Sequence, residues 1–178
     1  FAQMLLQDYA PELMVFSFTE SINEISVNER DVSDLLQKSP NSIDENPLRM
    51  PNEDLAIKTA DLLLKAKEDG QSFGGTARVV VKGVPRGLGQ PVFHKLKSDI
   101  ASALMSVGAT TGVEFGAGFA AAKQEGTQFH SENNTVYGGM RGGISTGENL
   151  DFRVAFKPTS SILDVAKRGR HDPCIVPR

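Results

Sequence analysis

The residue types best suited to chemistry are concentrated in the last 22 residues of the chain. The segment from Lys157 to Ser161 combines one ammonium group with three hydroxyl groups, and Arg170 and Asp172 follow, two positions apart. An ammonium beside hydroxyl donors suits a phosphate. On an extended segment, Arg170 and Asp172 would face the same way, so that one could hold an anion while the other transfers a proton. The pattern therefore predicts an anion and cofactor site.

Each of these features also has a structural interpretation. Hydroxyl side chains in a short run often cap a turn. An arginine and an aspartate two positions apart are equally compatible with a salt bridge at the protein surface. The residue types alone leave both alternatives open.

The distribution of charge supports a local anionic ligand. Residues 152–178 carry six Lys or Arg against two acids, whereas residues 1–70 carry fourteen acids against six bases, and the formal net charge is -3. Duplex nucleic acid requires many clustered cations. The overall acidic balance therefore argues against a nucleic-acid partner and favours a small-molecule substrate.

Other classes of site receive no support from the sequence. The histidines His94, His130 and His171 lack metal-ligand spacing, so we expect no metal. The single cysteine, Cys174, cannot form an intramolecular disulfide, which agrees with a reducing, cytoplasmic location. No apolar run reaches the length of a membrane span, so no membrane association is expected.

Helices and strands that could position these groups follow from hydrophobic periodicity. Capping by Asn52 and a stop at Gly70 predict a helix, and the alternation of apolar and polar residues over 150–157 predicts a half-buried strand. Pro91 predicts the start of a second helix, ending near Gly108. The remaining expectations are strands over 14–18, 22–27, 76–82 and 113–115, an opening helix remnant over 1–6, mostly connection over 28–46 and irregular backbone over 116–147. At this length we expect one domain over residues 1–178, of the α+β class.

Glycines are dense between Gly138 and Gly147. Such a segment could let backbone amides approach a phosphate or a flat ring. No phosphate-binding P-loop pattern is present, and tight turns are the alternative explanation of these glycines.

Taken as a set, six segments resemble the chorismate synthase family in order and near-spacing over almost the whole chain. They are residues 87–93 (GLGQPVF), 103–106 (ALMS), 112–116 (GVEFG), 142–147 (GGISTG), 157–162 (KPTSSI) and 170–174 (RHDPC). Any one of these segments would be weak evidence, whereas six in register are specific.

The resemblance implies a β-α-β sandwich with a helical core between antiparallel sheets, assembled as a homotetramer with flavin near subunit interfaces. It implies a lyase of the shikimate pathway of aromatic amino acid biosynthesis, a flavoprotein that converts 5-enolpyruvylshikimate 3-phosphate to chorismate by 1,4-elimination of phosphate. The implied cofactor is reduced FMN (FMNH2), and the reaction involves no net oxidation. NADP is expected as well, while the sequence leaves open whether a partner or the protein itself supplies the reduced flavin.

The family's functional positions carry over onto particular residues. By resemblance, FMN contacts are expected at Gly108, Ala109, Gly142, Lys157, Pro158, Thr159, Ser160, Ser161 and Arg170. Arg170 is also expected to bind substrate. Asp172 is the expected catalytic residue, near flavin N5, where it would assist proton transfer.

The chain also departs from the family pattern. It lacks counterparts of the amino-terminal segments that carry two acid histidines, and none of His94, His130 or His171 takes their role. The spacing from Lys157 to Arg170 is shorter than in typical members, and the family's last helix is missing. We therefore expect an incomplete domain, inactive by itself. The alternative function is a truncated fragment that only binds flavin or phosphate, or only oligomerises.

Overall fold

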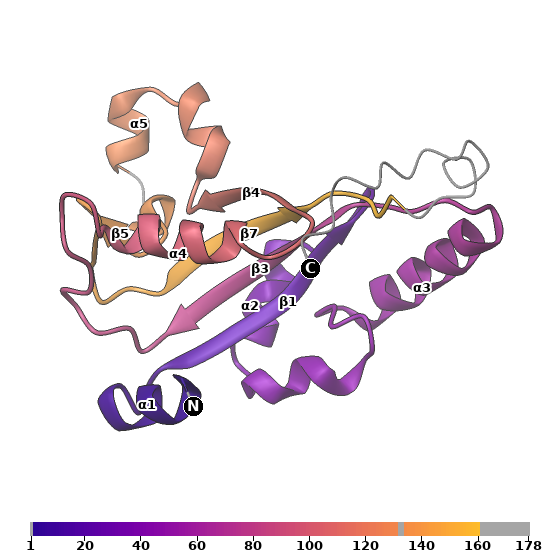
Figure 1. Ribbon diagram of the computed structural model, residues 1–178, viewed down its shortest axis with the longest axis horizontal. Helices are drawn as coiled ribbons and strands as arrows, with labels where there is room; N and C mark the ends of the chain where they lie inside the picture. The colour runs from indigo at the N-terminus through magenta and orange to yellow at the C-terminus, as the bar shows by residue number, and fades with distance from the viewer. Residues whose placement is uncertain (1, 132–133, 161–178) are drawn as a thin grey trace, which may run out of the picture.

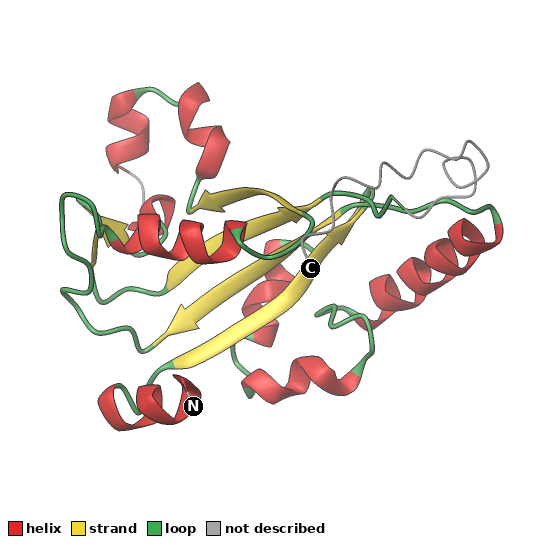
Figure 2. Cartoon of the chain, in the orientation of Figure 1, coloured by secondary structure: helices red, strands yellow, loops and turns green. Residues whose placement is uncertain are grey.

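A five-stranded antiparallel sheet forms the centre of the computed structural model, which describes residues 2–131 and 134–160 (Figures 1 and 2). The sheet has the order β2-β1-β3-β7-β4. Its strands are β1 (Met14–Ile22), β2 (Ile25–Ser26), β3 (Gly75–Lys82), β4 (Thr110–Phe115) and β7 (Leu150–Phe156), and β5 (Met140–Arg141) pairs with β6 (Ile144–Ser145) in a separate hairpin. The helices are α1 (Ala2–Tyr9), α2 (Glu29–Leu35), α3 (Glu53–Glu68), α4 (Leu96–Met105) and α5 (Gly126–Ser131), with 3-10 turns η1 (Pro40–Glu45), η2 (Gly118–Lys123) and η3 (Asn134–Tyr137).

Strand β7 lies between β3 and β4 and is antiparallel to both. Helix α4 connects β3 to β4, so this helix and its two strands form a β-α-β unit that is split by β7. The pairings Val79 with Phe152 and Phe115 with Phe152 place these apolar side chains on the same face. The neighbouring Asp151 and Arg153 point to the other face.

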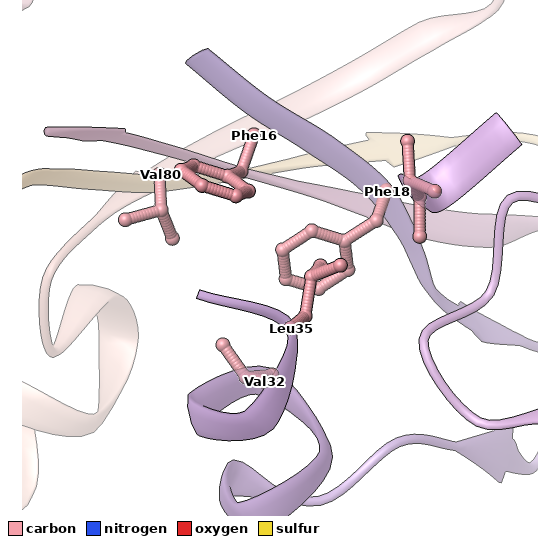
Figure 3. Close-up of a cluster of buried hydrophobic side chains, with 6 residues drawn as sticks. Phe16, Phe18, Val32, Leu35 and Val80 are labelled. Carbon is pink, nitrogen blue, oxygen red and sulfur yellow. The ribbon is translucent and has the colours of Figure 1, made fainter. Parts of the chain in front are cut away.

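One face of the sheet packs against α2 and η1. Phe16 and Phe18 of β1 and Val80 of β3 are buried against Val32 and Leu35 of α2, and the side chains point toward one another in Figure 3. Burying a phenylalanine of this kind contributes about 1.5–3 kcal/mol relative to exposure. This cluster fixes β1 and α2 to the centre of the sheet.

The opposite face packs against α4. Leu96, Ile100 and Leu104, which recur at helical spacing, contact a buried cluster that includes Phe152 and Val154 of β7. Figure 1 shows α4 lying along this part of the sheet. The helix therefore fixes the loops at its two ends relative to the sheet.

Several elements confirm the sequence-based expectations. The side chain of Asn52 accepts a hydrogen bond from the Leu55 amide at 3.1 Å and caps α3, as predicted. The alternating segment forms β7, with Leu150, Phe152 and Val154 buried. The α+β class with an antiparallel sheet is confirmed.

The expectation that residues 28–46 are mostly connection is wrong, because α2 (7 residues) and η1 (6 residues) occupy 13 of these 19 positions. Asn28 accepts hydrogen bonds from the amides of Arg30 and Asp31, and the Asp31 carboxylate accepts one from the Asn28 amide at 3.1 Å. This reciprocal capping box is visible as Asn28 followed three residues later by an acid, so the sequence contained the signal.

The predicted start of the second helix at Pro91 is also wrong. The backbones of Gln90 and His94 bond to each other in a tight loop, and α4 begins only at Leu96. Phe93, which lies within the range predicted for this helix, is 86% exposed. Residues 116–131 and 134–147 form short helical turns and two-residue strands, close to the expected irregular backbone.

Candidate functional site

The predicted cofactor residues that precede β4 lie beside those that follow β7. Gly108 and Ala109 precede β4, and Lys157 follows β7 directly. The first residue of β4, Thr110, pairs with the last residue of β7, Phe156. The Lys157 amide donates to the Ala109 carbonyl at 3.0 Å. Two segments about 50 residues apart in sequence thus meet at one end of the sheet, and we call them the Ala109–Lys157 cluster, comprising residues 108–109 and 157–160.

The segment after β7 is held from a second side. The Ser72 hydroxyl donates to the Thr159 carbonyl at 2.8 Å. At Gly74, an added Cβ would lie 2.6 Å from the Phe156 carbonyl oxygen and 3.1 Å from Pro158 Cδ. Glycine is therefore required at position 74, where the chain before β3 passes close to the end of β7.

Ala109 adopts an unusual backbone conformation for a non-glycine residue. Its φ is +67°, in the left-handed region. Such conformations persist where the surrounding structure imposes them, and they cluster at functional sites. Next to it, the Thr110 hydroxyl is buried without a hydrogen-bond partner in the described part of the chain.

The chemistry of this cluster suits an anion. Lys157, Thr159 and Ser160 are exposed. Among residues 2–131 and 134–160, no carboxylate lies within salt-bridge distance of the Lys157 ammonium. A cation and two hydroxyls that face solvent can contact the phosphate of a cofactor such as FMN. The donors present therefore fit the phosphorylated cofactor that the sequence predicts.

Gly142 lies apart from this cluster. It sits in the β5–β6 hairpin, where the Gly143 carbonyl accepts from the Leu96 amide at 2.8 Å, at the start of α4. Gly108 follows the other end of the same helix. At about 1.5 Å per residue, ten residues of α4 separate the two positions by roughly 15 Å. Within one copy of the chain, the predicted cofactor residues therefore form two groups.

Three predicted residues lie outside the described residues. They are Ser161, Arg170 and Asp172. Their roles stay predictions.

A network of ion pairs that sequence reasoning missed lies on the α2 face of the sheet. Arg78 is 6% exposed and binds both carboxylate oxygens of Asp151, at 2.9 and 2.7 Å. It also donates to Glu29 at 2.7 Å. Arg153 donates to Glu20 at 2.8 Å and to the Gly116 carbonyl at 3.1 Å.

The electrostatic environment keeps Arg78 charged. Burial alone would lower the pKa of Arg78, but hydrogen bonds and charges from Asp151 and Glu29 outweigh it and raise the pKa above its ordinary value. The signal in the sequence was an arginine inside the apolar run 76–82, which calls for a buried acidic partner.

Within the described ranges, no three His, Cys, Asp or Glu side chains are grouped so that they could hold a metal ion. In the same part of the chain, no helix combines the length and the apolar composition needed to cross a bilayer.

Comparison with known proteins adds independent evidence. A family model described as chorismate synthase matches residues 1–178. The chain belongs to the chorismate synthase family. It is 49% identical over 177 residues to a chorismate synthase of Bdellovibrio bacteriovorus, covering 99% of this chain and 51% of that protein. It is 35% identical to a chorismate synthase of Christiangramia forsetii, covering 91% of this chain and 50% of that protein.

The fold agrees with the family. A crystal structure of chorismate synthase superposes with a TM-score of 0.76 at 30% sequence identity, covering 90% of this chain and 53% of that one. The chain thus spans about half the length of the chorismate synthases that it matches.

Proposed function

We propose that the full-length protein is a chorismate synthase that uses reduced FMN to convert 5-enolpyruvylshikimate 3-phosphate to chorismate. The observation that carries the proposal is family membership over the whole chain, together with the clustering of residues 108–109 and 157–160 at one end of the sheet. A cytoplasmic location, NADP-linked supply of the reduced flavin and an incomplete single domain over residues 1–178 belong to the same proposal.

In this reaction a proton and phosphate leave the substrate, and a carbon-carbon double bond forms without net oxidation. Reduced flavin, when bound, supplies electron density toward the allylic phosphate. Lys157, with the hydroxyls of Thr159, Ser160 and Ser161, binds an anionic group and holds the cofactor in place. Asp172 assists the proton transfer near flavin N5, and Arg170 contacts both the cofactor and the substrate.

The separation of Gly142 from the Ala109–Lys157 cluster supports a site shared between copies of the chain. A single flavin would then contact the Ala109–Lys157 cluster of one subunit and Gly142 of another, in line with the proposed homotetramer. Exposed apolar side chains of α1 and of the loop before α4, among them Leu6, Tyr9 and Phe93, are available for such contacts.

The experiment is anaerobic incubation of the full-length protein with the substrate, with and without reduced FMN, followed by quantification of chorismate and phosphate. Equal amounts of both products, formed only with reduced flavin, are expected. Release of phosphate without chorismate would refute the proposal. Residues 1–178 expressed alone should form no chorismate, because catalytic groups that act as a unit lose most of their effect when members are absent.

A further inference from the structure

Residues 71–74 connect α3 to β3, and we call them the connecting segment. The chain here passes beside the end of β7 (Figure 1). The partly buried Ser72 donates its hydroxyl to the Thr159 carbonyl at 2.8 Å. Since β7 lies between β3 and β4, the residues after β7 are held by Ser72 from the β3 side and by Ala109 from the β4 side.

The connecting segment is fixed to α3 at its first residue. Helix α3 ends in a Schellman motif, in which the Gly70 amide donates to the Lys67 carbonyl at 3.2 Å and the Gln71 amide donates to the Ala66 carbonyl at 2.7 Å. Gly70 has a φ of +64°, which glycine adopts without strain. The direction in which the chain leaves the helix is therefore set one residue before Ser72.

The connecting segment is also fixed at its last residue. The Gly74 carbonyl accepts a hydrogen bond at 3.0 Å from the amide of Asn23, in the turn between β1 and β2. The next residue, Gly75, pairs with Ile22 of β1 and with Phe156 of β7. With both ends anchored, the backbone at Ser72 is in place before any ligand binds.

The residues that Ser72 holds are exposed. The side chains of Lys157, Thr159 and Ser160 face solvent, and Pro158 between them has no amide hydrogen to donate. The Lys157 amide bond to Ala109 fixes the start of this segment, and the Ser72 bond fixes its backbone two residues further on. Ordering an exposed segment costs conformational entropy, so a segment that is held in advance binds its ligand more tightly.

We propose that Ser72 is a positioning residue for phosphate binding. Its hydrogen bond holds residues 157–160 in the conformation in which the Lys157 ammonium and the Thr159 and Ser160 hydroxyls receive the phosphate of FMN. Ser72 acts through the Thr159 backbone and needs no contact with the cofactor. The inference rests on the proposed function for the identity of the ligand. It adds to that function a residue that lies outside the six segments that resemble the family.

The first test is a fluorescence titration of full-length Ser72→Ala with FMN and with riboflavin, which lacks the phosphate. The dissociation constant for FMN should rise about two- to tenfold, because one hydrogen bond no longer orders the segment. The constant for riboflavin should stay unchanged. A general loss of stability would instead weaken the binding of both ligands, so the ratio of the two constants separates positioning from a merely structural role.

The matched control is Ser42→Ala on η1. The Ser42 hydroxyl also donates to a backbone carbonyl at 2.8 Å, that of Ser39, and its loss should leave both dissociation constants unchanged. An unchanged ratio of the constants in Ser72→Ala overturns the proposal. If the wild type binds FMN no more tightly than riboflavin, the predicted phosphate site is refuted, and the proposed function loses its support together with the role of Ser72.

Amide hydrogen exchange of the ligand-free, full-length protein tests the contact apart from the proposed function. Peptides that contain residues 155–160 should exchange about twofold faster or more in Ser72→Ala, because the end of β7 opens more often when Thr159 is released. Ser42→Ala should exchange as the wild type does in these peptides. Equal exchange in Ser72→Ala and wild type overturns the proposal, whatever the flavin affinities are.

Discussion

The Lys157 amide donates a hydrogen bond to the Ala109 carbonyl at 3.0 Å, which joins the end of β7 to the residue before β4. Because Ala109 is held in a left-handed conformation, its carbonyl points at the strand end that carries the exposed ammonium and hydroxyl groups. The bond ties together two segments that the sequence separates by 48 residues, 157 − 109. The two segments therefore lie together as one candidate site.

Lys157→Ala should weaken FMN binding by roughly ten- to a hundredfold, since loss of a charged hydrogen bond costs about 1.5–3 kcal/mol. Lys157 is exposed, so the fold should be unaffected. The measurement is a fluorescence titration of the full-length protein with FMN, and Lys67→Ala on α3 is the matched control. Unchanged affinity in Lys157→Ala would remove this residue from the site.

Replacing Ala109 by glycine should leave stability unchanged or raise it by up to about 1 kcal/mol, because glycine adopts a positive φ without strain. Ala103→Gly, at an exposed position in α4, should instead lower the free energy of unfolding by about 1 kcal/mol. Urea unfolding of both variants gives the comparison. A loss of stability in Ala109→Gly as large as that in Ala103→Gly would show that the left-handed conformation costs nothing.

Arg78→Met should lower the free energy of unfolding by about 3 kcal/mol, because it leaves the partly buried Asp151 carboxylate without its bidentate partner. The control is Arg49→Met, which breaks an exposed ion pair with Asp44 and should cost at most about 1 kcal/mol. Comparable urea midpoints for the two variants would contradict a structural role of the network.

The effect of Arg78 should not depend on pH in the ordinary working range. The pKa of Arg78 is raised, so its stabilising contribution is present below the ordinary arginine pKa and is lost only as the pH rises through the folded-state value. The difference between wild type and Arg78→Met should therefore be equal at about pH 6 and about pH 9. If the difference in unfolding free energy at about pH 9 were only half of that at about pH 6, another titrating group would be indicated.

Asp172→Asn in the full-length protein should lower turnover by roughly 10²–10⁴-fold, the usual span for a general acid-base group, with a much smaller effect on FMN and substrate affinity. Stopped-flow measurement of the decay of flavin intermediates, with a thermal melt alongside, is the check. If Asp172 is instead a structural partner of Arg170, stability or ligand binding suffers while turnover at saturation stays near normal.

The sequence predicted those elements whose signals are local. Asn52 marks the start of α3, and strict alternation marks β7. Helix α2 was overlooked although its capping box is local, because its acidic composition suggested a connection. The ion pairs of Arg78 could not be predicted, since Asp151 is 73 positions away and the register of β3 on β7 decides which side chains meet.

The candidate site, like the fold, could be predicted from the sequence only in part. Motif order identified Lys157 and Ala109, but only the pairing of β4 with β7 brings them into contact. The separation of Gly142 from them follows from the length and packing of α4, which no motif records.

The most direct test of the central claim is a crystal structure of the full-length protein with FMN bound. We predict flavin density with its phosphate within hydrogen-bond distance of residues 157–161, beside Ala109, and with Gly142 contributed by a second subunit. Flavin bound elsewhere, with the Lys157 ammonium and the Thr159 and Ser160 hydroxyls still facing solvent, would contradict the account.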